Sequence, residues 1–225
     1  MRAPISVIIP TLNAANGLPG CLAALMPGLE AGVIRELVIS DGGSQDATLR
    51  IAEEVGARVV TGAPGRGGQL RRGAAQATGP WLLFLHADTR LSPDWVDAVA
   101  PVLDGQGAWA FRLRFDAPGL APRWVAGWAN LRSRVFGLPY GDQGLLVPRA
   151  LYDRVGGFPD QPLMEDVAIA RCLRGRIGLL PGLAVTEADR YRRNGWLRQG
   201  ARNLWRLIRY LAGVPAERLQ RGYDR

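Results

Sequence analysis

The sequence of 225 residues contains no lysine, so all 28 of its basic side chains are arginines. This absence excludes a P-loop lysine, a Schiff-base lysine and the lysine of a kinase-type site. Codon bias alone can remove lysine from a sequence, but arginine still supplies the positive charge. With 20 acidic residues the formal net charge is +8, which favours anionic partners such as phosphates, nucleic acid or acidic lipid headgroups.

Cysteine and histidine are also scarce. Cys21 and Cys172 stand far apart and outside any CxxC pair, which excludes a zinc-finger pattern and a disulfide framework. We expect both to be buried thiols in a reducing compartment. His86 is the one histidine, so HExxH motifs and multi-histidine metal sites are excluded.

Long apolar runs are missing as well. No window approaches the ~18 apolar residues of a membrane span, and the first residues, MRAPISVIIPT, do not have the pattern of a secretory signal. We therefore expect a cytoplasmic protein, with contact at the inner face of a membrane left open. Apolar residues make up 48% and charged residues 21%, which is typical of a globular chain.

Short apolar runs alternate with segments of helical spacing, a pattern that predicts an α/β fold with a parallel sheet covered by helices on both faces. In the first half the predicted strands are 5–9, 36–40, 57–61 and 81–85, and the predicted helices are 15–26, 45–55, 68–77 and one starting at Pro93. The second half predicts strands at 108–115, 144–147 and 177–180 and helices at 121–136, 165–173 and 196–212. We expect one domain over residues 1–195, with a basic helical segment over 196–225 that packs on it or on a membrane surface.

Polar side chains follow the ends of three predicted strands. Thr11 and Asn13 follow the first strand, Asp41 follows the second, and His86 and Asp88 follow the fourth. Ligands of parallel sheets bind outside the carboxyl ends of the strands, so these side chains are candidates for a binding site. Local alternatives remain, because an aspartate before two glycines is ordinary turn chemistry, Asp88 also suits a turn or cap, and a lone histidine is more often structural.

A dinucleotide-binding interpretation fails at the first turn, which reads PTLNAANG where the fingerprint requires GxGxxG. The later GRGGQLRR segment carries Arg66, which could hold an anionic ligand. Arg71 and Arg72 of the same segment fit a solvated basic face equally well. A nucleotidyltransferase would normally have a glycine-rich basic loop after the first strand, and PTLNAANG is not one, but that class stays an alternative.

Two acidic segments of the second half are further candidates. YGDQGLLV places Asp142 and Gln143 between glycines, which allows close approach to a ligand and equally suits a polar turn. PLMED places Glu165 and Asp166 at a helix start, where one could act as a general base and where both also suit the helix dipole. RYRRNGW adds Arg193, which could grip a phosphate. We expect contacts to an acceptor or a phosphate from Asp142, Gln143, Glu165 and Arg193.

The last predicted helix is amphipathic. One stripe is basic, and the other is apolar with Leu197, Ala201, Leu204, Trp205, Ile208 and Leu211. Such a helix can lie on an anionic membrane. The alternative is a helix that docks on the core and leaves its basic face in water.

Taken in order, five segments resemble a family 2 glycosyltransferase with the GT-A fold: VIIPTLN, SDGGSQDAT, LLFLHADT, GGF and MED. The resemblance covers roughly residues 5–212 and implies a Rossmann-like, mostly parallel central sheet. With HADT, GDQG and PLMED, the chain most resembles a compact bacterial subgroup linked to arsenosugar biosynthesis. The activity implied is transfer of a sugar from a nucleotide diphosphate sugar, by family default a UDP-sugar, to an acceptor hydroxyl.

The resemblance also implies roles on the donor side. Pro10, Thr11 and Asn13 would border the nucleotide pocket. Asp41 would bind the base or the ribose, and Arg66 would lie near the diphosphate.

The metal and the base follow from two further motifs. Asp88 stands at the last position of the family's DxD motif and would bind Mn²⁺ or Mg²⁺. The first aspartate of that motif is replaced by His86, which removes a charge and an oxygen ligand and puts metal dependence in question. Asp166 stands at the position of the general base in inverting members.

The expected partners are therefore a nucleotide-sugar donor and a small-molecule or lipid-linked acceptor, without a specific nucleic acid. Besides the nucleotidyltransferase, the alternative is a non-catalytic basic module that binds anions or a membrane.

Overall fold

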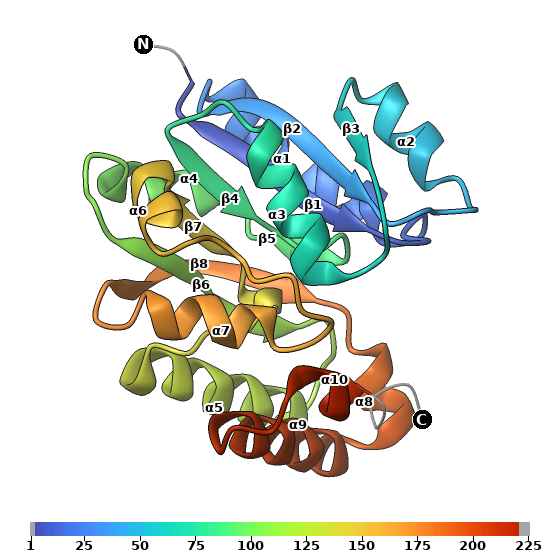
Figure 1. Cartoon of the computed structure of the whole chain (residues 1–225), viewed down its shortest axis with the longest axis vertical. Coiled ribbons are helices and arrows are strands. Elements are labelled where there is room, and N and C mark those ends of the chain that lie inside the picture. Colours follow the sequence, from blue (N-terminus) through green and yellow to red (C-terminus); the bar gives the residue numbers. More distant parts are fainter. Residues whose placement is uncertain (1–2, 221–225) are drawn as a thin grey trace.

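An eight-stranded sheet runs through the computed structural model, which describes residues 3–220 (Figure 1). Its strand order is β3-β2-β1-β4-β7-β6-β8-β5. The strands are β1 Ile5–Thr11, β2 Ile34–Asp41, β3 Arg58–Thr61, β4 Trp81–Phe84, β5 Thr89–Leu91, β6 Ala108–Phe115, β7 Leu145–Pro148 and β8 Ile177–Thr186.

Most strands of the sheet point the same way. β1 pairs in parallel with β2 and β4, β2 with β3, and β6 with β8. β7 is antiparallel to both β4 and β6, and β5 is antiparallel to β8. The prediction of a mostly parallel α/β sheet is confirmed, and β5 and β7 are the two reversed strands of this sheet.

Helices cover both faces of the sheet, as predicted. They are α1 Leu18–Glu30, α2 Thr48–Glu54, α3 Arg66–Gln76, α4 Trp95–Val99, α5 Leu120–Phe136, α6 Arg149–Arg154, α7 Glu165–Cys172, α8 Asp189–Asn194, α9 Trp196–Leu211 and α10 Ala216–Gln220. Successive side chains of a strand point to opposite faces, so neighbouring residues of β1 pack against helices on opposite sides of the sheet. Val7 and Ile9 pack with α1 and α4, whereas Ile8 packs with α3, α6 and α7.

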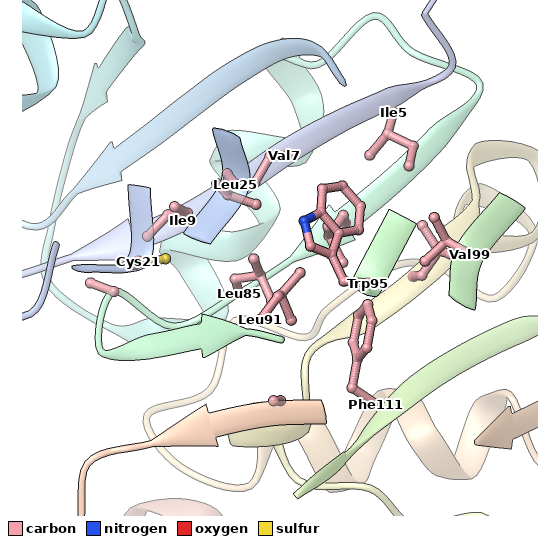
Figure 2. Packing of buried hydrophobic residues seen from close by; sticks show 14 of the residues in the cluster. Ile5, Val7, Ile9, Cys21, Leu25, Leu85, Leu91, Trp95, Val99 and Phe111 are labelled. Atoms are coloured by element: carbon pink, nitrogen blue, oxygen red, sulfur yellow. The ribbon is translucent and has the colours of Figure 1, made fainter. Parts of the chain in front are cut away.

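The first of these two core layers is built around large side chains (Figure 2). Trp95 of α4 and Phe111 of β6 are fully buried, and Figure 2 shows the indole lying among Ile5, Val7 and Phe111. Gly28 of α1 lets the indole approach, since a Cβ there would lie 2.1 Å from Cζ2 of Trp95.

Strand β8 is longer than the sequence predicted. The expected strand ended at Leu180, before Pro181 and Gly182, but β8 continues to Thr186. Its pairing with β6 shifts register between Ala110 and Arg112, so the proline and glycine are accommodated at a bulge. Four short elements, β5, α6, α8 and α10, were not predicted.

The C-terminal helices lie beyond β6 and β8, where α9 packs against α5 and α8 (Figure 1). The predicted C-terminal segment 196–225 thus contains α9 and α10, and its residues 221–225 lie outside the described part of the chain. Within residues 3–220, every helix is too short or too polar to cross a bilayer. The cysteine prediction was half right, because Cys21 is buried and Cys172 is exposed.

Candidate functional site

Two cavities adjoin at the carboxyl ends of the first strands. The β1 cavity has a volume of about 540 Å³ and includes Pro10, Thr11 and Asn13 in its lining. The α7 cavity has a volume of about 430 Å³ and includes Tyr140, Asp166, Tyr191 and others from the second half of the chain. The two share one wall, formed by Arg66, His86, Asp88, Leu163 and Glu187.

Asp41 at the end of β2 holds the floor of the β1 cavity together. Its Oδ1 accepts hydrogen bonds from Thr11 Oγ1 at 2.8 Å and Ser44 Oγ at 2.5 Å, and its Oδ2 accepts from the N–H groups of Gly43 and Ser44, both at 2.7 Å. Although burial alone would raise the pKa of this carboxyl, these hydrogen bonds lower it, so Asp41 is ionised.

The hydrogen bonds that Asp41 already accepts bear on its predicted contact with a base or ribose. A carboxylate has about four lone-pair sites, and all four are used by the chain itself. Asp41 is fully buried and lies behind Thr11, outside the lining of the cavity. A direct ligand contact would have to exchange one of these bonds.

The loops after β1 and β2 are also tied to each other. Asn13 donates its N–H to Ser44 Oγ and accepts from the N–H of Gln45 at its own Oδ1, both at 2.8 Å. This exchange holds Asn13 at a positive φ of 51°, which asparagine tolerates better than most residues. Gln69 of α3 was not predicted as a site residue. Its Nε2 donates to the carbonyls of Thr11 and Ser40 at 2.7 and 2.9 Å.

An ion pair joins the shared wall to the start of α7. Arg66 at the start of α3 lies 3.5 Å from Oε1 of Glu165 at the start of α7. Glu165 is 1% exposed. Burial and the neighbouring Asp166 raise the pKa of the Glu165 carboxyl to about 7, against the lowering effect of Arg66. Arg66 is the cation that faces the Glu165 carboxyl.

His86 is neutral at physiological pH. Burial and the positive charge of Arg66 lower the pKa of its imidazole to about 3. Its Nε2 closely approaches the backbone of Gly141, where an added Cβ would lie 2.5 Å away. The imidazole can therefore serve as a metal ligand or a hydrogen-bonding group, but it carries no charge.

Asp88 is exposed where the two cavities meet. The surrounding protein removes water from its carboxyl and raises the pKa, and this outweighs the lowering by Arg66 and Arg190. A bound cation would offset that cost. Residues 3–220 contain no cluster of three or more histidine, cysteine or acidic side chains arranged for a metal. The side chains present fit Mg²⁺ or Mn²⁺ held by one carboxylate, the neutral imidazole of His86 and oxygens of a ligand.

Asp166 is fixed in the wall of the α7 cavity. Its Oδ2 accepts the N–H of Gly141 at 2.8 Å, and its Oδ1 accepts the N–H of Val167 at 2.7 Å. Met164, directly before α7, has a positive φ of 62°, which sets the direction in which the helix starts. Each carboxylate oxygen keeps a second acceptor site, so Asp166 is held in place and can still take a proton from a ligand.

Asp142 lies beside this base candidate in the α7 cavity. Its Oδ1 is buried and has no hydrogen-bond partner among residues 3–220. Burial raises the pKa of the carboxyl to about 6, and Asp166 and Asp88 add to the effect while Arg132 opposes it. Arg132 in turn stacks on the ring of Tyr140, with its Cζ 3.5 Å from the ring centroid.

The structure contradicts the prediction of a ligand contact for Gln143. This side chain is fully buried, and its amide donates to the carbonyl of Phe111 at 3.0 Å while its Oε1 accepts from Ser133 Oγ at 2.7 Å. Gln143 therefore joins α5 to β6. The three other residues predicted with it, Asp142, Glu165 and Arg193, do line the α7 cavity.

Several lining residues of the two cavities were not predicted from the sequence. Glu187 belongs to the shared wall, and Asn203 and Arg206 of α9 line the α7 cavity. Glu187 directly follows β8, so the rule that ligands bind at strand ends would have found it had the strand been extended to Thr186.

The chain is similar to known glycosyltransferases in sequence. Residues 6–138 match the family model described as Glycosyl transferase family 2. A "PGL/p-HBAD biosynthesis glycosyltransferase" of Mycobacterium bovis (strain BCG / Pasteur 1173P2) is 43% identical over 99 residues, which are 40% of this chain and 38% of that relative. An "Uncharacterized glycosyltransferase" of Mycobacterium tuberculosis (strain CDC 1551 / Oshkosh) is 29% identical over 180 residues, 73% of this chain and 79% of that relative.

Solved structures show the same fold. S. aureus TarS 1-349 in complex with UDP has a TM-score of 0.62 and 19% identity, over 91% of this chain and 64% of that one. The glucosyl-3-phosphoglycerate synthase of Mycobacterium tuberculosis, in complex with Mn²⁺, UDP and glucosyl-3-phosphoglycerate, has a TM-score of 0.57 and 24% identity, over 82% of this chain and 70% of that one. The fold predicted from the resemblance, GT-A, is confirmed.

Proposed function

The chain belongs to glycosyl transferase family 2, and on that premise we propose that it transfers a sugar from a nucleotide diphosphate sugar to the hydroxyl of an acceptor. One observation carries the proposal. The β1 cavity and the α7 cavity share a wall that holds Arg66 and Asp88, while Asp166 lies in the α7 cavity alone. A donor in the first cavity and an acceptor in the second would meet at this wall.

The donor we propose is a UDP-sugar. TarS has been solved with UDP-GlcNAc, and the mycobacterial synthase with UDP, which supports a uridine nucleotide. In this chain the nucleoside would lie against Pro10, Thr11 and Asn13, on the floor that Asp41 fixes. The diphosphate would then extend toward Arg66, whose guanidinium lines both cavities.

A divalent cation at Asp88 fits this placement. The mycobacterial synthase was crystallised with Mn²⁺. Mg²⁺ or Mn²⁺, held here by Asp88 and the uncharged His86, would supply positive charge to the leaving diphosphate. Because a carboxylate of the usual motif is missing, Arg66 carries more of that task in this chain.

We propose that Asp166 is the general base of an inverting, single displacement. It would accept the proton of the acceptor hydroxyl as the new bond to the anomeric carbon forms and the bond to the diphosphate breaks. The N–H groups of Gly141 and Val167 orient its carboxylate for this step. Glu165 is less suited to the role, because its buried carboxyl faces Arg66 and holds that guanidinium in the shared wall.

The acceptor would lie among Asp142, Glu165 and Arg193. A small molecule or a lipid-linked sugar both suit these groups. The HADT, GDQG and PLMED segments support the compact bacterial subgroup linked to arsenosugar biosynthesis as the proposed place of this chain in the family. We keep the cytoplasm as the expected location.

The test compares Asp166→Asn with the wild-type chain and with Asp153→Asn, an exposed carboxylate on α6. Release of UDP from a panel of UDP-sugars, with and without candidate acceptors, reports turnover, and calorimetry reports UDP affinity. We expect Asp166→Asn to lose turnover about 100-fold or more while UDP affinity stays the same. Unchanged turnover would overturn the role of Asp166, and a wild-type chain that binds no UDP would overturn the donor class.

A further inference from the structure

We propose that α5 and α9 together form a docking surface for an anionic phospholipid membrane. The two helices lie side by side at the edge of the molecule, beyond β6 and β8 (Figure 1). They carry eleven of the fifteen large apolar side chains that are exposed among residues 3–220. This α5–α9 face consists of Leu120, Trp124, Trp128, Leu131, Val135 and Phe136 on α5 and of Leu197, Leu204, Trp205, Ile208 and Leu211 on α9.

Helix α9 is turned the opposite way from a helix that docks on a core. Its apolar stripe faces outward, with Leu197 68% and Trp205 60% exposed. Its inward side is partly polar, since Gln199 is buried and donates to Asn203 Oδ1 at 2.8 Å. Helix α9 thus packs on α5 and α8, and its apolar stripe lies on the outer side.

Helix α5 continues the same apolar face. Its inward side is made largely of small residues, among them Ala126 and Ala129, which pack against β6. Its outward side keeps large residues at intervals of three and four, from Leu120, which is 82% exposed, to Val135, which is 60% exposed. Large exposed apolar patches on a monomer mark interaction sites, and scattered single residues do not.

The charges on the two helices select the kind of partner. The sequences of α5 and α9 contain three and four arginines and no acidic residue. Arg123, Arg134, Arg198 and Arg202 are exposed beside the apolar residues. An apolar face with Trp side chains and an arginine border is the composition of helices that lie in the interface of anionic bilayers.

The same charges argue against a second copy of this chain as the occupant. A two-fold dimer through the α5–α9 face would bring identical arginine-bordered surfaces together, and like charges in contact are unfavourable. The position of α9 also suits a membrane partner. Its inward residues Asn203 and Arg206 line the α7 cavity, so one helix separates that cavity from the proposed membrane surface.

The experiment measures sedimentation of the full chain with vesicles of phosphatidylcholine alone and with about 30% phosphatidylglycerol added. The test variants are Val135→Ser/Leu197→Ser, which shortens the apolar face, and Arg198→Gln/Arg202→Gln, which removes charge. The matched controls are Leu29→Ser/Val55→Ser, at exposed apolar residues elsewhere, and Arg50→Gln/Arg154→Gln, at exposed arginines elsewhere. Since all these side chains are exposed, we expect each variant to fold, which circular dichroism checks.

We expect the wild-type chain and both controls to bind the anionic vesicles, and each test variant to bind about tenfold more weakly. Equal binding to neutral vesicles would overturn the assignment to an anionic surface. If Val135→Ser/Leu197→Ser binds the anionic vesicles as tightly as the wild-type chain, charge attraction alone explains the binding, and the proposal is overturned. If the wild-type chain forms a stable dimer in solution and Val135→Ser/Leu197→Ser is monomeric, the α5–α9 face binds a second copy of the chain instead, and the proposal is overturned.

Discussion

Replacing Asp142 by asparagine should stabilise the protein at neutral pH. The carboxyl of Asp142 is buried with an unpaired Oδ1, and its pKa rises from 3.8 to about 6 on folding. The folded chain therefore holds the proton more tightly than the unfolded chain. Proton binding by Asp142 therefore contributes to the free energy of unfolding. This contribution is complete below pH 3.8 and is lost as the pH rises through about 6.

The size of the effect follows from the two pKa values. They differ by about two pH units, and at 1.36 kcal/mol per unit this corresponds to about 3 kcal/mol of lost stability above pH 7. Asp142→Asn removes the ionisation but keeps the size of the side chain. We expect the free energy of unfolding to rise by up to about 3 kcal/mol at pH 8, which corresponds to a melting temperature higher by roughly 6–12 °C. We expect little gain at pH 4.

Urea unfolding at a series of pH values from 4 to 8 measures this difference for the wild-type chain, Asp142→Asn and Asp104→Asn. Asp104 lies in an exposed turn outside both cavities, so Asp104→Asn is the matched control for the loss of one carboxyl. Stability curves for the wild-type chain and Asp142→Asn that run parallel across this pH range would show that ionisation of Asp142 does not destabilise the fold. A stabilised variant with weakened activity would show that Asp142 is kept for function at a cost in stability.

Two further predictions concern the metal and the core. UDP should raise the melting temperature of the protein, and Mn²⁺ together with UDP should raise it further. We expect Asp88→Ala to keep the rise caused by UDP alone and to lose the further rise caused by Mn²⁺. If Mn²⁺ raises the melting temperature of this variant as much as that of the wild-type chain, Asp88 is not a metal ligand. Gly28→Ala would place a Cβ 2.1 Å from Trp95 Cζ2, so we expect a loss of about 1–3 kcal/mol in urea unfolding with UDP affinity unchanged. Full stability of Gly28→Ala would mean that the indole moves aside.

The sequence predicted the first four strands well because each one is a short apolar run bounded by turn residues. The polar residues after β1 and β4 were found by the same logic, since strand ends place them at one edge of the sheet. The predicted end of β8 was wrong because the local sequence and the pairing with a distant strand indicate different ends. Pro181 and Gly182 look like the end of a strand, but β8 passes through them because β6 pairs on both sides of the bulge.

Gln143 and α9 show a second kind of limit. A glutamine between glycines resembles a ligand-binding residue, and only the folded chain reveals that Phe111 and Ser133 use up its amide. The stripes of α9 are visible in the sequence, but their spacing does not say which one faces the body of the protein. Burial of a polar group and the orientation of a helix both depend on residues far away in the chain.

The weak anchoring of α9 has a consequence for local unfolding. The helix buries only Gln199 and Leu207, so its opening should cost much less free energy than opening the central strands, and its amides should exchange hydrogen early. Each opening of α9 also removes part of the lining of the α7 cavity, because Asn203 and Arg206 belong to this helix. The fraction of molecules with a complete α7 cavity is thus set by a local equilibrium. A partner that covers the outer side of α9 shifts this equilibrium toward the folded helix.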